Sequence, residues 1–227
     1  MSSLESLAPD LWVVSRPLPI AVGDVGCRMT VIRLADGGLW LHSPVALDDE
    51  MERELAQIGP VRWIVAPSKV HSLFLAAAAA RYPDALKFAA PGLPEKRPKL
   101  AFSATLGDDA PLAWRGQIDQ CVVQGMPVAN EVAFLHRASR TLILTDLVFN
   151  VPADRTAGAR LFYWLVGAGG RFGPHRILRL GMRDRRAVRR SIDSILAWDF
   201  ERVIMSHGEV LECCGHARLG EAFSFLN

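Results

Sequence analysis

The stretch that decides the fold covers residues 131–150 and reads EVAFLHRASRTLILTDLVFN. It contains two apolar runs, at 131–135 and 141–145, and both have the composition of buried strands. The five residues between them are mostly polar and are suited to a turn. The stretch therefore predicts a β-hairpin whose second strand ends at a carboxylate, Asp146.

Further elements are indicated on both sides of this hairpin, and each half of the chain has antiparallel strands followed by strand and helix units. The predicted strands cover residues 11–14, 29–34, 39–41, 61–66, 86–90, 121–123 and 202–205, and the predicted helices cover 48–58, 73–80, 158–166, 184–198 and 219–226. Two such halves favour an α/β fold, a four-layer αββα sandwich of two mixed β-sheets with helices outside. The strand pattern alone is equally compatible with other α/β folds.

We expect one domain over residues 1–227, because no linker rich in Gly, Ser or Pro is long enough to separate two cores. Residues 91–116 are rich in Pro, Gly and Asp. This composition is typical of a long surface connection, here placed where it would frame a site.

The composition is that of a folded protein and excludes several classes of function. Half of the 227 residues are apolar, and 26 Lys and Arg against 24 Asp and Glu leave a net charge of +2. Such a charge gives no long-range attraction to nucleic acid or anionic lipid. No apolar run reaches the roughly 18 to 20 residues of a transmembrane helix, and the N-terminus lacks the basic flank of an export signal. We expect a cytoplasmic protein with reduced cysteines and no nucleic-acid or membrane partner.

Candidate site residues lie at or shortly after the carboxyl ends of four predicted strands: His42, His71, Asp146 and His207. Ligands of open α/β sheets gather at this edge, where side chains are held by a rigid frame. The other three histidines, His136, His175 and His216, are expected at the surface or in turns.

At these residues the chain resembles the metallo-β-lactamase superfamily over nearly its whole length. The closer resemblance is to an uncharacterised, mainly bacterial branch of that superfamily. It rests on three segments together: APSKVH at 66–71, the hairpin stretch at 131–150, and SHG at 206–208. The resemblance implies the four-layer sandwich and metal-dependent hydrolysis.

The metal-binding motif of that superfamily is incomplete in this chain. Catalytic members carry HxHxDH after the fourth strand, which supplies ligands to two metals. Here His71 takes the place of the aspartate, while Pro67, Lys69 and Ser72 take those of the histidines. A further expected histidine, near residues 124–127, is also missing. The resemblance therefore implies at most one metal ion.

The residues that remain form a set of two imidazoles and one carboxylate. His71, Asp146 and His207 could together hold one divalent zinc, iron or manganese ion. Asp146 and His207 match the superfamily's bridging aspartate and final histidine, and are expected to be catalytic. His42 lies near the position of an aspartate that supports the ligands from behind. The competing interpretation is a metal-free Asp146–His207 pair that only stabilises the strand ends.

Two functions from different classes follow. The first is a metal-dependent hydrolase with one ion that acts on an ester, lactone or amide-type small molecule. The second is a catalytically inactive binding or interaction module without metal. Its surface would combine residues 91–116 with the stretch 171–190, which has eight arginines and one acid. Helical spacing also explains those arginines as the solvated face of a helix.

Overall fold

The first half of the chain forms a seven-stranded mixed sheet. The computed structural model describes residues 4–20, 23–152, 163–164, 167 and 169–226. The strand order is β1 (Glu5–Ala8), β2 (Leu11–Arg16), β5 (Cys27–Arg33), β6 (Leu39–His42), β7 (Val61–Ala66), β8 (Leu86–Ala89) and β9 (Ala104–Thr105). Pairing is antiparallel from β1 to β6 and parallel from β6 to β9. β3 (Pro19–Ile20) and β4 (Gly23–Asp24) pair antiparallel with each other, and they lie between β2 and β5 in the sequence.

The second half forms a four-stranded mixed sheet around the hairpin that the sequence predicts. Its order is β10 (Ile118–Val122), β11 (Val132–His136), β12 (Thr141–Ile143) and β15 (Arg202–Ile204). β11 and β12 pair antiparallel, and β12 and β15 pair parallel. The carboxyl ends of β12 and β15 therefore lie side by side. A two-stranded ribbon, β13 (Phe149–Asn150) and β14 (Phe172–Gly173), follows at this end.

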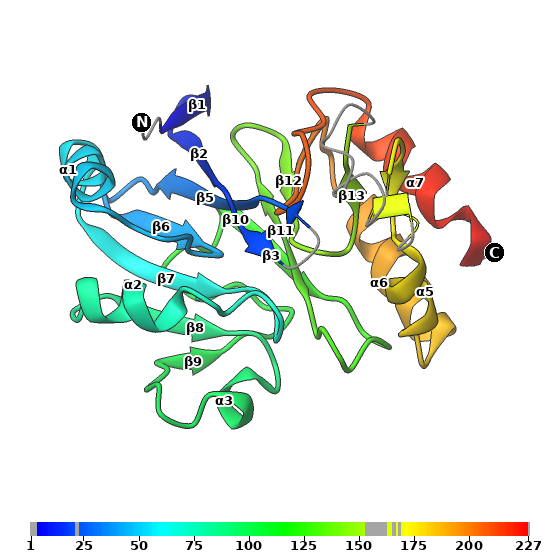
Figure 1. The fold of residues 1–227 in the computed structure, drawn as a ribbon, viewed down its shortest axis with the longest axis horizontal. Helices are drawn as coiled ribbons and strands as arrows, with labels where there is room; N and C mark the ends of the chain where they lie inside the picture. Colours follow the sequence, from blue (N-terminus) through cyan, green and yellow to red (C-terminus); the bar gives the residue numbers. More distant parts are fainter. Residues whose placement is uncertain (1–3, 21–22, 153–162, 165–166, 168, 227) are drawn as a thin grey trace.

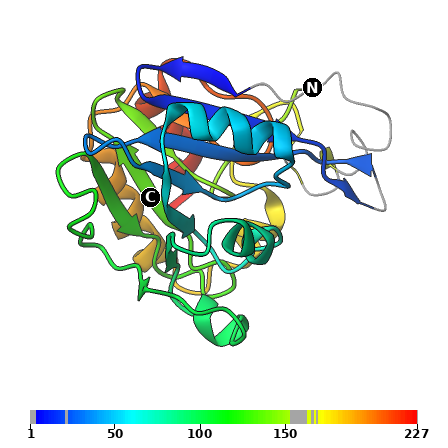
Figure 2. The same ribbon diagram turned by 90° about the vertical axis from the view of Figure 1, so that its left-hand side faces the viewer.

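Helices cover the outer faces of both sheets (Figure 1). On the first sheet these are α1 (Asp49–Ile58) and α2 (Leu75–Arg81), which Figure 2 shows in front of the strands, with α3 (Leu93–Lys96) near β9. On the second sheet they are α5 (Arg176–Leu180), α6 (Arg185–Leu196) and α7 (Gly215–Phe223), followed by the short 3-10 helix η1 (Ser224–Leu226). None of the helices in the described ranges is long and apolar enough to cross a membrane.

Three apolar layers correspond to the three interfaces of a four-layer sandwich. The layer between the sheets includes the fully buried Trp40, Trp114 and Phe134. The first sheet packs on α1 and α2 through residues such as Met29 and Leu55, and the second packs on α6 and α7. The predicted four-layer αββα sandwich is confirmed.

Residues 91–116 differ from the surface connection that their composition predicts. They contribute α3 and β9 to the fold, and Leu93, Leu106 and Trp114 are buried. The Trp114 ring packs edge-on against Trp40 and Phe88. The surface interpretation was wrong at these positions, because a few large side chains anchor a segment that is otherwise polar.

The structure shifts the start of one predicted helix and describes only a small part of another. The helix predicted from residue 73 begins at Leu75, since the preceding residues form the loop that carries His71. The helix predicted at 158–166 falls mainly outside the described residues.

Candidate metal centre

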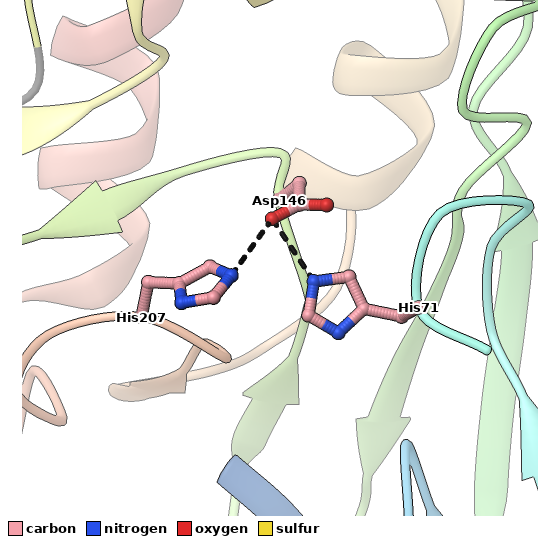
Figure 3. A group of neighbouring side chains, drawn as sticks. All are labelled: His71, Asp146 and His207. Carbon is pink, nitrogen blue, oxygen red and sulfur yellow. Dashed lines mark ion pairs between the residues drawn. The ribbon is translucent and has the colours of Figure 1, made fainter. Parts of the chain in front are cut away.

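Three predicted site residues meet where the two sheets adjoin. Asp146 follows β12 and His207 follows β15, so the parallel pairing of these strands places the two side chains together. His71 comes from the other sheet, in the loop after β7. Figure 3 shows the two imidazole rings approaching the Asp146 carboxylate from different sides.

The distances among the three side chains suit one metal ion. Asp146 Oδ1 lies 3.1 Å from His71 Nε2 and 3.4 Å from His207 Nε2. The three ligand atoms all lie within 4.8 Å of one another. Ligand atoms about 2.0–2.2 Å from a common Zn²⁺ lie roughly 3–3.5 Å apart, and both distances from Asp146 Oδ1 fall in this range. The side chains are 11–15% exposed, so the group is largely buried but not sealed from solvent.

Hydrogen bonds behind the two imidazoles orient their Nε2 atoms toward Asp146. His207 Nδ1 lies 2.8 Å from the carbonyl oxygen of Gly26, and His71 Nδ1 lies 3.1 Å from Ser43 Oγ. A carbonyl oxygen only accepts, so Nδ1 of His207 donates and the lone pair of a neutral ring points from Nε2 toward Asp146. That lone pair faces a carboxylate oxygen, an arrangement that needs a proton or a cation between them. Metal-binding histidines are held by such bonds from the distal nitrogen.

The loop that carries His71 is fixed by the second sheet as well as by its own residues. His71 donates its backbone N–H to Ser68 Oγ at 3.0 Å. Pro67 O accepts from Val132 N, and Lys69 N donates to Ala129 O, both at 2.8 Å. The loop therefore belongs to the same rigid frame as the hairpin.

Positions that hold histidines in the superfamily motif make structural contacts in this chain. Lys69 Nζ donates to Pro127 O at 2.8 Å, and Ser72 Oγ accepts from Arg97 Nε at 3.3 Å. Within the described residues, no further group of three His, Cys, Asp or Glu side chains could hold a second ion. His71, Asp146 and His207 are therefore the group in the described residues that could hold a metal ion.

Glu131 is a site residue that sequence reasoning missed. Its side chain is fully buried, and its two oxygens accept from Thr145 N at 2.6 Å and Asp146 N at 2.9 Å. These bonds hold the backbone at the point where Asp146 leaves β12. The available signal was an acidic residue at the start of a buried strand, where an unpaired charge is costly.

The electrostatics of the centre are dominated by burial and by the close charges. Burial lowers the pKa of His71, but attraction to Asp146 and Glu131 outweighs it, so the pKa lies above its ordinary value. Burial raises the pKa of Asp146, but both histidines outweigh it and hold this pKa well below its usual range. Burial and the Asp146 charge raise the pKa of Glu131 to about 7. Two carboxylates and two imidazoles thus share a site that attracts cations.

The predicted supporting residue His42 lies deeper than the three central side chains. It stacks on Trp40 and packs edge-on against Phe134, and its Nε2 has no hydrogen-bond partner among the described residues. Burial, with a smaller effect of His71, lowers its pKa to about 3. The neighbouring Ser43 makes the hydrogen bond to His71, and the supporting role of His42 stays a prediction.

The other histidines are not all surface residues. His136 is buried and bonded to Ser139, so the expectation of a surface position was wrong there. His175 caps α5 and packs edge-on against Phe149, whose ring stacks on His207 at 5.3 Å. Phe149 and His175 therefore form one wall beside the metal centre. His216 is exposed, as expected.

Solved structures that share this fold include metallo-β-lactamases. DIM-1 metallo-β-lactamase has a TM-score of 0.68 and 15% sequence identity, with 99% of this chain and 96% of that chain covered. The enzyme from Pontibacter korlensis has a TM-score of 0.68 and 14% identity, with coverage of 100% and 99%. FIM-1 from Pseudomonas aeruginosa in its mono-zinc form has a TM-score of 0.63 and 13% identity, with coverage of 99% and 92%. At such identities the likeness establishes the metallo-β-lactamase fold and leaves the activity open.

Sequence comparison identifies the family of this chain through a family model. No match was found among curated proteins. The family model described as "Domain of unknown function (DUF4336)" matches residues 9–162, about two thirds of the chain. The chain therefore belongs to the DUF4336 family and has the metallo-β-lactamase fold.

Proposed function

We propose that this protein is a metal-dependent hydrolase with one divalent ion, acting on an ester, lactone or amide bond of a small molecule. The observation that carries the proposal is the orientation of His207. Its Nδ1 donates to a backbone carbonyl, and its Nε2 points at the Asp146 carboxylate 3.4 Å away. A metal cation held between Nε2 and the carboxylate would satisfy both groups, as a proton on Nε2 would.

His71, Asp146 and His207 would hold the ion, which we expect to be zinc, iron or manganese. When bound, such an ion acts as a Lewis acid and lowers the pKa of water toward neutrality. Asp146 supplies negative charge, and the two imidazoles are kept in orientation by Gly26 O and Ser43 Oγ. Glu131 keeps the backbone of Asp146 in place. Phe149 packs its ring on His207 and is in turn contacted by His175.

The four cysteines are free, and their state supports a reducing compartment, the cytoplasm, as the place where this activity operates.

The test is the metal content and hydrolytic activity of untagged protein purified without added metal. We expect about one ion per chain, lost in His71→Ala and in Asp146→Asn. His216→Ala is the matched control, because His216 is exposed and its contacts, with Leu196 O and the Phe200 ring, lie outside the candidate centre. Hydrolysis of an ester and lactone panel should follow the metal content of these variants.

A second function, a binding module without metal or catalysis, is favoured by the non-ligand residues Pro67, Lys69 and Ser72 in the motif positions. Protein that stays metal-free after incubation with zinc, iron(II) or manganese(II), and is inactive on the panel, would support this second function and refute the first.

A further inference from the structure

A small pocket on the outer side of the second sheet collects three arginines from three different elements. It has a volume of about 300 Å³, and its charged lining residues are Arg171, Arg179, Arg218 and Glu221. Arg171 adjoins β14, Arg179 lies on α5, and Arg218 lies on α7. None of these side chains belongs to the metal centre.

The floor of the pocket is formed by the close approach of β14 to α7. Phe172 and Gly173 are buried, and a Cβ on Gly173 would lie 3.3 Å from the Cβ of Ala222. Glycine at this position lets the strand come close to the helix. The result is a concave surface between elements.

Two of the three guanidinium groups are oriented by neighbours that carry no negative charge. The Arg179 guanidinium lies 3.8 Å from the centre of the Phe225 ring, and Arg171 donates to Gly167 O at 3.1 Å. Stacking leaves the N–H groups at the edge of a guanidinium free to donate. These contacts reduce the conformational entropy that a ligand would have to remove.

The positive charge in this pocket is only partly balanced by acidic groups of the described residues. Among the residues that the structure describes, no carboxylate lies within ion-pair distance of Arg171, Arg179 or Arg218. Glu221 is the one acidic residue that the described part of the chain contributes to the lining. The pocket therefore has an excess of positive charge over negative.

A second cavity provides a contrast. It measures about 920 Å³ and includes Arg33 and Arg137 in its lining, but these are paired with Asp10 and Asp119. That cavity has no unpaired arginine to attract an anion. The arginines of α6 provide a second contrast with those of the small pocket. Arg186, for example, is exposed and does not line that pocket.

We propose that the pocket of Arg171, Arg179 and Arg218 binds the phosphate group of a small phosphorylated molecule. Guanidinium groups match phosphate oxygens in a bidentate geometry, and three of them can bind one phosphate from different directions. The volume suits a small ligand rather than a macromolecule. Pro174 in the lining directly precedes His175 in the chain, so the pocket and the candidate metal centre are connected through this segment.

The experiment is calorimetric titration of the full chain with inorganic phosphate and with pyrophosphate at low ionic strength. We expect saturable binding that weakens about tenfold or more in Arg179→Gln and in Arg218→Gln, through loss of charge-assisted hydrogen bonds. Glu221→Gln should strengthen binding, because it removes the opposing charge. Arg186→Gln makes the same charge change outside the pocket and should bind as the unmodified protein does.

Three results would overturn the proposal. One is absence of saturable binding. Another is that Arg186→Gln weakens phosphate binding as much as Arg179→Gln does, and that the protein binds a single-stranded oligonucleotide more tightly than phosphate. This result would indicate a non-specific basic surface. The third is binding that is lost in His71→Ala but retained in Arg179→Gln, which would place the phosphate at the metal centre.

Discussion

At the scale of single residues, the candidate centre depends on side chains that hold the ligands as much as on the ligands themselves. Glu131 accepts two backbone N–H groups at the end of β12, and Gly26 O and Ser43 Oγ hold the distal nitrogens of the two imidazoles. Each contact fixes a ligand atom relative to the other two. Removal of such a contact should weaken metal binding without removing a ligand.

Glu131→Gln tests this role of the supporting residues. The amide group of glutamine replaces one acceptor oxygen by a donor that opposes a backbone N–H. We expect the free energy of unfolding to fall by about 1–3 kcal/mol and metal affinity to fall about 10- to 100-fold. Urea unfolding and chelator competition measure the two effects.

The control for this variant is Glu209→Gln, since Glu209 is exposed and should change stability by less than about 0.5 kcal/mol. Unchanged metal affinity in Glu131→Gln, in protein that binds metal before mutation, would remove Glu131 from the metal-binding machinery.

The cysteines should divide into two reactive and two protected thiols. Cys213 and Cys214 are exposed, whereas Cys27 and Cys121 are buried. Burial, with smaller contributions from Asp24 and Asp108, raises the pKa of each buried thiol to about 11, so almost no thiolate is present at neutral pH. Brief alkylation with iodoacetamide followed by peptide mass spectrometry should label only Cys213 and Cys214. The same treatment in urea should label all four, and rapid native labelling of Cys27 or Cys121 would contradict the burial.

At the scale of elements, the metal centre depends on how strand ends turn into loops. Gly208 follows His207 and bridges to Asn150 of β13, with a φ of 91° in the left-handed region. A Cβ there would lie 2.2 Å from the carbonyl oxygen of Asn150. Only glycine permits this close approach, which joins the His207 loop to the ribbon of β13 and β14.

Gly208→Ala should therefore destabilise the protein by about 1–3 kcal/mol and weaken metal binding, because the loop that carries His207 must shift. Thermal unfolding and metal content provide the measurements. Gly220→Ala is the matched control: Gly220 lies in α7 with no atom within 4 Å of an added Cβ. Alanine in a helix should stabilise by about 0.4–1 kcal/mol. If both variants shift stability in the same direction, the steric argument for Gly208 is wrong.

At the scale of the whole molecule, two sheets share one apolar layer and one site. Trp40 of the first sheet packs against Phe134 of the second with ring centres 5.2 Å apart. Arg28 of β5 donates to Met205 O and Gly208 O, and His207 contacts Gly26 O. These contacts link the two halves of the chain both in the core and beside the metal centre.

We therefore expect the chain to unfold as one cooperative unit, as the single-domain prediction requires. Tryptophan fluorescence and far-UV circular dichroism should give coincident urea transitions in the presence of a chelator. Chelation removes the separate effect of metal binding on stability. Two resolved transitions would indicate two domains and refute the single-domain prediction.

The sequence alone determined the local elements and the positions of the central side chains. Alternation of apolar residues and turn-forming residues predicted the hairpin of β11 and β12 and strand β7, because these patterns reflect interactions between near neighbours. It also placed Asp146 and His207 at strand ends, and the resemblance to a known fold supplied the layers.

Tertiary structure decided everything that depends on residues distant in the chain. It brought His71 from one sheet to Asp146 of the other, and it revealed Glu131 as a support. It buried Trp114 within a segment of polar composition, and it gathered Arg171, Arg179 and Arg218 around one pocket. The physical reason is that local periodicity reports which face of an element is apolar, whereas contacts between separate elements depend on how the layers pack.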